Sequence, residues 1–111
     1  MIPFTFIIIL VLFLHWFGDF VLQSNDMAMN KSKSIKWLSI HCLVYTLTLC
    51  ICGIPFAIVN GISHWCIDYC TSKITSKLWL DGDRHNFFVM IGFDQFLHVS
   101  ILIVTAMWLI F

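Results

Sequence analysis

The sequence predicts an all-α fold, a polytopic membrane protein with four transmembrane helices in a small bundle, from its composition and from four apolar runs. The chain has 111 residues, of which 60% are hydrophobic and 11% are charged. A soluble domain of this length leaves too much of its surface in water to hide so many apolar side chains. A bilayer removes that cost, and we expect residues 1–111 to form a single transmembrane domain.

The four apolar runs are long enough, as helices, to span a thin hydrocarbon core. Because lipid offers no hydrogen-bond partners to free backbone groups, spanning segments of this kind should be helical. Gly53 and Pro55 predict a tight turn between the second and third runs. The predicted spans are residues 3–22, 35–52, 54–69 and 87–111.

The loops between the runs predict the orientation. Two polar loops, residues 24–34 and 71–86, fall on the same side, and all six Lys and Arg lie in them or, for Lys36, just after the first. By the positive-inside rule this side faces the cytoplasm, so both termini face away from it. These cations are expected to set the topology and to contact anionic lipid headgroups. The formal net charge of zero gives no reason to expect nucleic acid as a partner. Membrane lipid is the expected partner. Because four short helices bury little area together, association into a homo-oligomer also stays open.

Each predicted span carries polar side chains four residues apart. Residues at this spacing lie on one face of a helix. Counted along the helical rise, the His and Asp side chains among them fall in the cytoplasmic half of every span, so we expect these to meet at one depth. They are His15, Asp19 and Gln23 in the first span, His41 and Tyr45 in the second, Asn60, His64 and Asp68 in the third, and Asp94 and His98 in the fourth.

Ionisable side chains at this depth need a compensating partner, since each costs about 2.5 to 3.5 kcal/mol on insertion scales. A divalent metal, as one or two ions of Zn, Fe or Mn, would suit His and Asp ligands. Two such ions would be balanced by three carboxylates and one hydroxide. An Asp one turn from a His could instead orient that His. The predicted metal ligands are His15, Asp19, His41, His64, Asp68, Asp94 and His98.

A metal-bound water would supply a nucleophile at neutral pH, which predicts a metal-dependent hydrolase. The depth favours a lipid or lipid-linked (phospho)ester near the cytoplasmic leaflet as the substrate. Asp19, Asp68 and Asp94 would serve as ligands or as a general base. Gln23 and Tyr45 would donate to an oxyanion or phosphoryl oxygen, or are ordinary polar packing.

Three other interpretations stay open at this point. His–Asp pairs can simply hold a bundle together by hydrogen bonds. A His/Asp relay can carry protons or ions in a small transporter or channel. A structural, phage-type membrane protein could use a metal for stability alone.

Four short motifs resemble a family of small, uncharacterised bacterial and phage inner-membrane proteins, grouped as a domain of unknown function. The motifs are LHWFGDFVLQSNDMAMNKSKS, HCLVY, SHWCIDY and FDQFLHV, between residues 14 and 99. That family is loosely similar to predicted membrane-bound metal-dependent hydrolases, which is a fold-level analogy. The resemblance implies a bacterial inner-membrane location and names no substrate. Its pattern falls on His15, Asp19, Gln23, His41, His64, Asp68, Asp94, Gln95 and His98.

Overall fold

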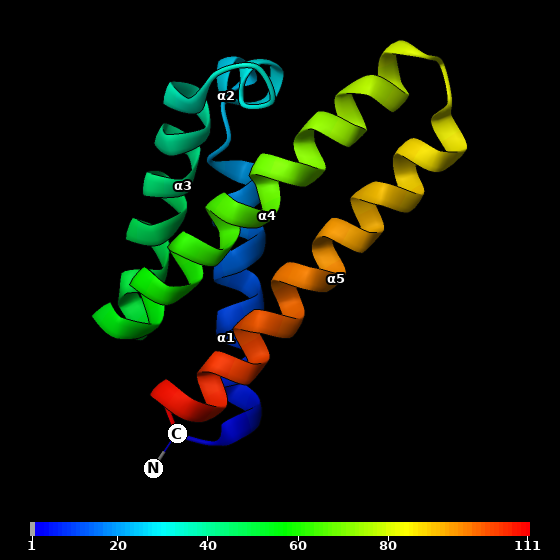
Figure 1. Cartoon of the computed structure of the whole chain (residues 1–111). Helices are drawn as coiled ribbons and strands as arrows, with labels where there is room; N and C mark the ends of the chain where they lie inside the picture. The colour runs from blue at the N-terminus through cyan, green and yellow to red at the C-terminus, as the bar shows by residue number, and fades with distance from the viewer. Residues whose placement is uncertain (1) are drawn as a thin grey trace.

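The computed structural model describes residues 2–111, and every regular element in that range is helical. This confirms the all-α class. The molecule is elongated, with principal extents of 50 × 27 × 20 Å. Figure 1 shows α4 and α5 as a long antiparallel pair, with α3 beside α4 and α1 behind. The elements are α1 (Phe4–Trp16), the π-helix η1 (Phe17–Val21), α2 (Asn25–Asn30), α3 (Ile35–Leu49), the 3-10 turn η2 (Cys50–Cys52), α4 (Ile54–Leu80) and α5 (Arg84–Leu109).

Three helical segments are long and apolar enough to cross a membrane, namely Phe4–Val21, Ile35–Cys52 and Arg84–Leu109. The long helix α4 is not among them, so the predicted count of four spans is not confirmed. The physical reason is the polar stripe of α4, because Asn60, His64 and Asp68 lower its average hydropathy. These side chains are buried among the other helices.

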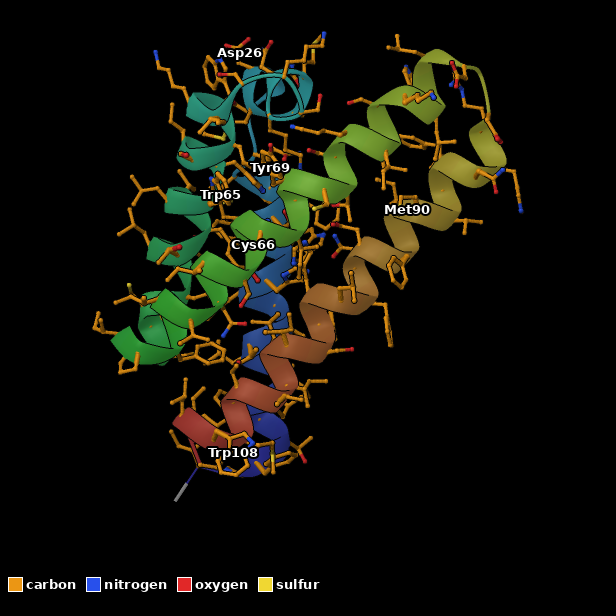
Figure 2. The ribbon with its side chains drawn as sticks, in the orientation of Figure 1. Asp26, Trp65, Cys66, Tyr69, Met90 and Trp108 are labelled. Carbon is orange, nitrogen blue, oxygen red and sulfur yellow. The ribbon has the colours of Figure 1, made fainter. Side chains whose placement is uncertain are left out.

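The two ends of the bundle differ in chemistry. The short helix α2 and the α4–α5 turn lie at one end, and both termini lie at the other (Figure 1). Figure 2 shows the contrast in two labelled side chains, Asp26 at the first end and Trp108 near the termini. All six Lys and Arg belong to segments at or near the first end, which we call the cationic end.

The predicted polar loop over residues 71–86 is wrong for most of its length, because α4 continues to Leu80. The hydroxyls of Thr71 and Ser72 donate to carbonyl oxygens one turn earlier, at 2.9 and 2.5 Å, so these polar side chains are satisfied inside the helix. The chain reverses at Gly82, whose φ of +75° is a left-handed conformation that favours glycine. The extra turns of α4 extend one wall of the bundle toward the cationic end.

The loop predicted over residues 24–34 also contains a helix, the short α2. Its first turn is capped by Ser24, whose Oγ accepts a hydrogen bond from the backbone N–H of Met27 at 3.2 Å. Ser34 caps α3 in the same way. The predicted turn between the second and third runs is present, with Gly53 at φ +115°.

An apolar core fills the half of the bundle nearer the termini. Val11, Leu49 and Leu102 are completely buried there, and Phe56 and Tyr45 pack in the same cluster. This core joins α1, α3, α4 and α5 by close side-chain packing. The buried polar residues described next lie on the side of it that faces the cationic end.

Candidate metal centre

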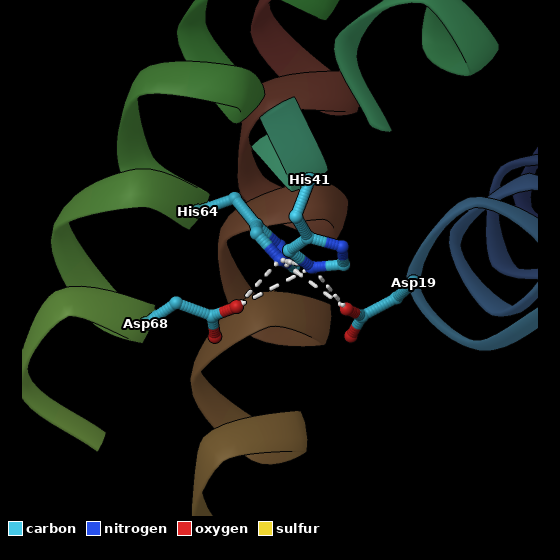
Figure 3. Close-up of side chains that lie close together, drawn as sticks. All are labelled: Asp19, His41, His64 and Asp68. Carbon is cyan, nitrogen blue, oxygen red and sulfur yellow. Dashed lines mark hydrogen bonds and ion pairs between the residues drawn. The ribbon is translucent and has the colours of Figure 1, made fainter. Parts of the chain in front are cut away.

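Four buried side chains from three elements point at a common centre (Figure 3). Asp19 comes from the π-helix η1, His41 from α3, and His64 and Asp68 from adjacent turns of α4. Each is at most 4% exposed. Spacing of four residues brings His64 and Asp68 to one face of α4. The π-helix is an element often found at functional sites, and here it carries Asp19.

Five separations between the ligand atoms of these residues lie between 3.0 and 3.4 Å. His41 Nε2 is 3.0 Å from Asp19 Oδ1, 3.1 Å from His64 Nε2 and 3.4 Å from Asp68 Oδ2. His64 Nε2 is 3.3 Å from Asp19 Oδ1 and 3.1 Å from Asp68 Oδ2. Zinc bonds of about 2.0 to 2.1 Å in a tetrahedron would place neighbouring ligand atoms roughly 3.3 to 3.4 Å apart. The five observed separations are close to these values, so the group could hold a metal ion.

One hydrogen bond from each ring nitrogen would use only some of these close approaches. A ring nitrogen carries at most one proton, which points in one direction. Yet His41 Nε2 has three close neighbours, and His64 Nε2 has three as well. The other ring nitrogens, His41 Nδ1 and His64 Nδ1, are buried without a hydrogen-bond partner in the described part of the chain. A cation at the centre would satisfy all four converging atoms at once.

Asp94 and His98 of α5 adjoin this group. His98 Nε2 is 3.1 Å from Asp68 Oδ1 and 3.2 Å from Asp94 Oδ1. Thr71 donates a hydrogen bond of 2.6 Å to Asp94 Oδ1. Asp94, His98 and Asp19 form a second group, whose ligand atoms lie within 4.8 Å of one another. The structure thus brings together six of the seven predicted metal ligands in two adjoining groups.

His15, the seventh predicted ligand, lies beside the groups rather than in either of them. Its Nδ1 is 2.8 Å from the Tyr45 hydroxyl, and its Nε2 is 2.7 Å from Gln95 Oε1. Gln95 Oε1 can only accept, so Nε2 of a neutral His15 carries the proton and Nδ1 accepts from Tyr45. Gln95 Nε2 in turn donates to Asp19 and Asp94, at 3.1 Å each. Both ring nitrogens are occupied, and His15 connects Tyr45 to the carboxylates.

Two members of the predicted stripes are placed differently from the expectation. Gln23 does not continue the helical face of His15 and Asp19, because the helix ends at Val21. Its Oε1 is nevertheless buried without a partner within residues 2–111, in the wall of a cavity. Asn60 donates to Thr105 Oγ1 at 2.8 Å and thereby ties α4 to α5 below the site.

A cavity of about 560 Å³ opens beside the two groups toward the cationic end. Its polar wall includes Asp19, Asp68 and Asp94, which also belong to the ligand groups. The rest of the wall carries large apolar side chains, among them Phe20, Met29, Trp79, Phe87 and Ile91. A molecule with one polar and one apolar part would match this lining.

Lys31 enters the same cavity and is the main residue that sequence reasoning missed. Its Nζ donates to Asp68 Oδ2 at 3.2 Å, although the sequence suggested only a topological and headgroup role. Burial alone would lower the pKa of Lys31, but attraction by Asp68, Asp19 and Asp94 outweighs it and raises the pKa above its ordinary value. Lys31 is therefore positively charged at neutral pH. It follows α2, outside any helical stripe, so no periodicity could have indicated it.

The fold and the site define a helical protein with membrane-spanning capacity and a buried His/Asp cluster that could hold a metal ion. The chain belongs to a family described as a protein of unknown function (DUF3307), whose model matches residues 7–111. This confirms the membership of a family of unknown function that the four motifs suggested. No curated protein and no solved structure matches the chain. A bacterial or phage source and a likeness to metal-dependent hydrolases stay predictions.

Proposed function

We propose that the chain crosses the bacterial inner membrane four times, with the cationic end in the cytoplasm and both termini on the opposite side. The gathering of all Lys and Arg near one end supports this orientation. The fourth span would be α4. Its polar stripe is covered by the other helices, whereas Ile54, Ile58 and Ile62 are exposed on its outer side, as lipid contact requires.

We further propose that Asp19, His41, His64 and Asp68 bind a divalent cation. The single observation that carries this proposal is the set of five separations, 3.0 to 3.4 Å, that join their ligand atoms. Two carboxylates neutralise a dication, and neutral imidazoles complete its coordination. The cation would also remove the repulsion between two buried carboxylates. Zn, Fe and Mn all accept this mixture of imidazole and carboxylate ligands.

The reaction we propose is hydrolysis of a lipid or lipid-linked phosphoester. A bound divalent cation would activate water and polarise a phosphoryl oxygen. The cavity supports a substrate of this class, because its apolar wall can hold the start of a lipid chain and its polar wall adjoins the site. Lys31 and Lys33 supply positive charge to the same cavity, where an anionic phosphoryl group would be bound.

A proton or ion relay is the second candidate, and the hydrogen-bonded chain from Tyr45 through His15 and Gln95 to Asp94 favours it. The apolar core argues against conduction across the whole membrane. Leu49, Phe56 and Leu102, at most 1% exposed, fill the interior between this chain and the termini. We therefore prefer the hydrolase.

Elemental analysis of detergent-purified protein tests the proposal. We expect stoichiometric Zn, Fe or Mn in the native chain and in His85→Ala, a matched control whose imidazole is exposed and outside the site. His64→Ala should lose the metal. Hydrolysis of phospholipid or prenyl-phosphate esters should stop on chelation and return with added metal. Metal-free protein that drives pH-dependent ion flux in liposomes would instead favour the relay, and a metal-bound protein without hydrolysis would favour a structural metal.

A further inference from the structure

The carboxylate of Asp68 faces two groups of ligand atoms, one with each oxygen. Its Oδ2 lies 3.1 Å from His64 Nε2 and 3.4 Å from His41 Nε2. Its Oδ1 lies 3.1 Å from His98 Nε2. A carboxylate that divides its oxygens in this way has the geometry of a bridging ligand between two cations.

The two carboxylate oxygens of Asp19 also face different partners. Its Oδ1 belongs to the four-atom group, at 3.0 Å from His41 Nε2 and 3.3 Å from His64 Nε2. Its Oδ2 is turned toward α5, where it accepts a hydrogen bond from Gln95 Nε2 at 3.1 Å. The same amide group donates to Asp94 Oδ2. Asp19 and Asp94 thus approach each other closely, although both are buried carboxylates that would repel.

The Nε2 atom of His98, like those of His41 and His64, faces more than one close polar atom. It lies 3.1 Å from one carboxylate oxygen and 3.2 Å from another, on Asp68 and Asp94. One N–H cannot point at both. His98 is 3% exposed and Asp94 8% exposed, so water supplies little compensation. A second cation placed among these atoms would satisfy all of them.

We propose that the chain binds two divalent cations, the second held by Asp94 and His98 and bridged to the first by Asp19 and Asp68. This inference rests on the first cation site proposed above. Two-metal sites with ions roughly 3.5 to 4 Å apart stabilise both the attacking and the leaving oxygen in phosphoryl chemistry. Thr71 orients Asp94 through a 2.6 Å hydrogen bond, as supporting residues do around metal ligands.

The charge of the assembled centre narrows the substrate class. Two dications exceed the three carboxylates of the centre by one positive charge, and the ammonium groups of Lys31 and Lys33 add two more at the cavity wall. A phosphoester anion and a hydroxide, or a phosphomonoester dianion, would offset most of that excess in the cavity. A neutral carboxylic ester would not. The two-cation centre therefore favours phosphoester over carboxylester substrates.

The test loads chelator-washed protein in detergent with Mn²⁺ alone and measures bound metal per chain together with the electron paramagnetic resonance spectrum. We expect two ions per chain and an exchange-coupled spectrum for the native protein and for His85→Ala. Asp94→Asn and His98→Ala should each retain one ion, with the hyperfine pattern of isolated Mn²⁺. Asp94→Asn preserves side-chain shape and the hydrogen bond from Thr71, so it tests the site even if His98→Ala fails to fold.

The outcomes separate this inference from the proposed function. One ion per native chain, unchanged in Asp94→Asn, would overturn the second site and leave the first intact. Two ions retained in both variants would overturn the assignment to Asp94 and His98. No ion in the native chain would overturn both proposals together.

Discussion

The interior of the bundle has two halves built from the same helices, and they differ in what completes them. In the half near the termini, apolar side chains such as Leu49, Phe56 and Leu102 satisfy one another by packing. In the half toward the cationic end, buried histidines and aspartates crowd together at hydrogen-bond distances, and each Nε2 of His41 and His64 faces more neighbours than one N–H can reach. The first half is filled by apolar packing, whereas the second gathers buried His and Asp side chains that could hold a metal ion.

This difference suggests that the apolar half supplies stability and the polar half supplies the candidate metal ligands. Close packing of the apolar half would fix the positions of four helices relative to one another. The polar half would then use that rigidity to hold its ligands in place, because a metal site needs side chains fixed before the ion arrives. Substitutions that separate stability from metal binding should expose the division.

The largest effect is expected from Asp68→Asn, which removes the charge shared by both ligand groups while preserving shape. Supporting residues around a metal typically contribute 10- to 100-fold in affinity, so loss of a bridging ligand should weaken binding by more than about 100-fold. Equilibrium dialysis of detergent-solubilised protein with Zn²⁺ measures the change, with His85→Ala as the control. Native affinity in Asp68→Asn would rule out this centre.

Phe56→Ala is the matching change in the apolar half. Removing a buried phenyl ring should lower the free energy of unfolding by about 3 to 5 kcal/mol through lost packing and a cavity. Denaturant titration in mixed micelles measures that loss. Metal per folded chain should stay at the native value, because Phe56 belongs to the apolar core cluster and precedes His64 by about two helical turns of α4. If Phe56→Ala kept its native helix content but lost the metal, metal binding would depend on packing in the apolar half.

Much of the polar half could be predicted from sequence, because helical spacing is local information. The steps from His64 to Asp68 and from Asp94 to His98 place each pair on one face, and both pairs do meet in the structure. The return of polar residues to one depth in successive antiparallel spans was enough to predict their convergence. Residue type and periodicity therefore carried the central expectation.

The remainder depended on features that periodicity does not encode. The π-helix η1 ends the first helical segment before Gln23, so counting in steps of four fails at that residue. The occupied ring of His15 depends on Gln95, a residue from another helix. Lys31 reaches the site from the residue that follows the short helix α2. The polar composition of residues 71–80 suggested a loop. In the structure the segment is helical, because hydroxyls such as those of Thr71 and Ser72 donate hydrogen bonds to carbonyl oxygens one turn earlier in α4.

Metal removal should produce the next largest effect. A ligand that binds only the folded state stabilises it by about 2.7 kcal/mol when present at 100 times its dissociation constant. Chelation should therefore lower the Tm of the native protein, and added Zn²⁺ should restore it. In Asp68→Asn, which lacks the carboxylate shared by both ligand groups, the Tm should respond to neither treatment at the same Zn²⁺ concentration. A Zn²⁺-dependent rise in that variant would show stabilisation from another site.

The smallest expected effect concerns Tyr45, which lies on the boundary between the two halves. Its ring packs in the apolar core, while its hydroxyl is 2.8 Å from His15 Nδ1. Tyr45→Phe keeps the ring and removes only that donor, so the free energy of unfolding should fall by about 1 kcal/mol. Nitrogen NMR shifts of His15 should change, because Nδ1 loses its hydrogen bond, while metal per chain should not. If Tyr45→Phe instead released the metal, Tyr45 would belong functionally to the polar half, and the boundary would lie one helical turn nearer the termini.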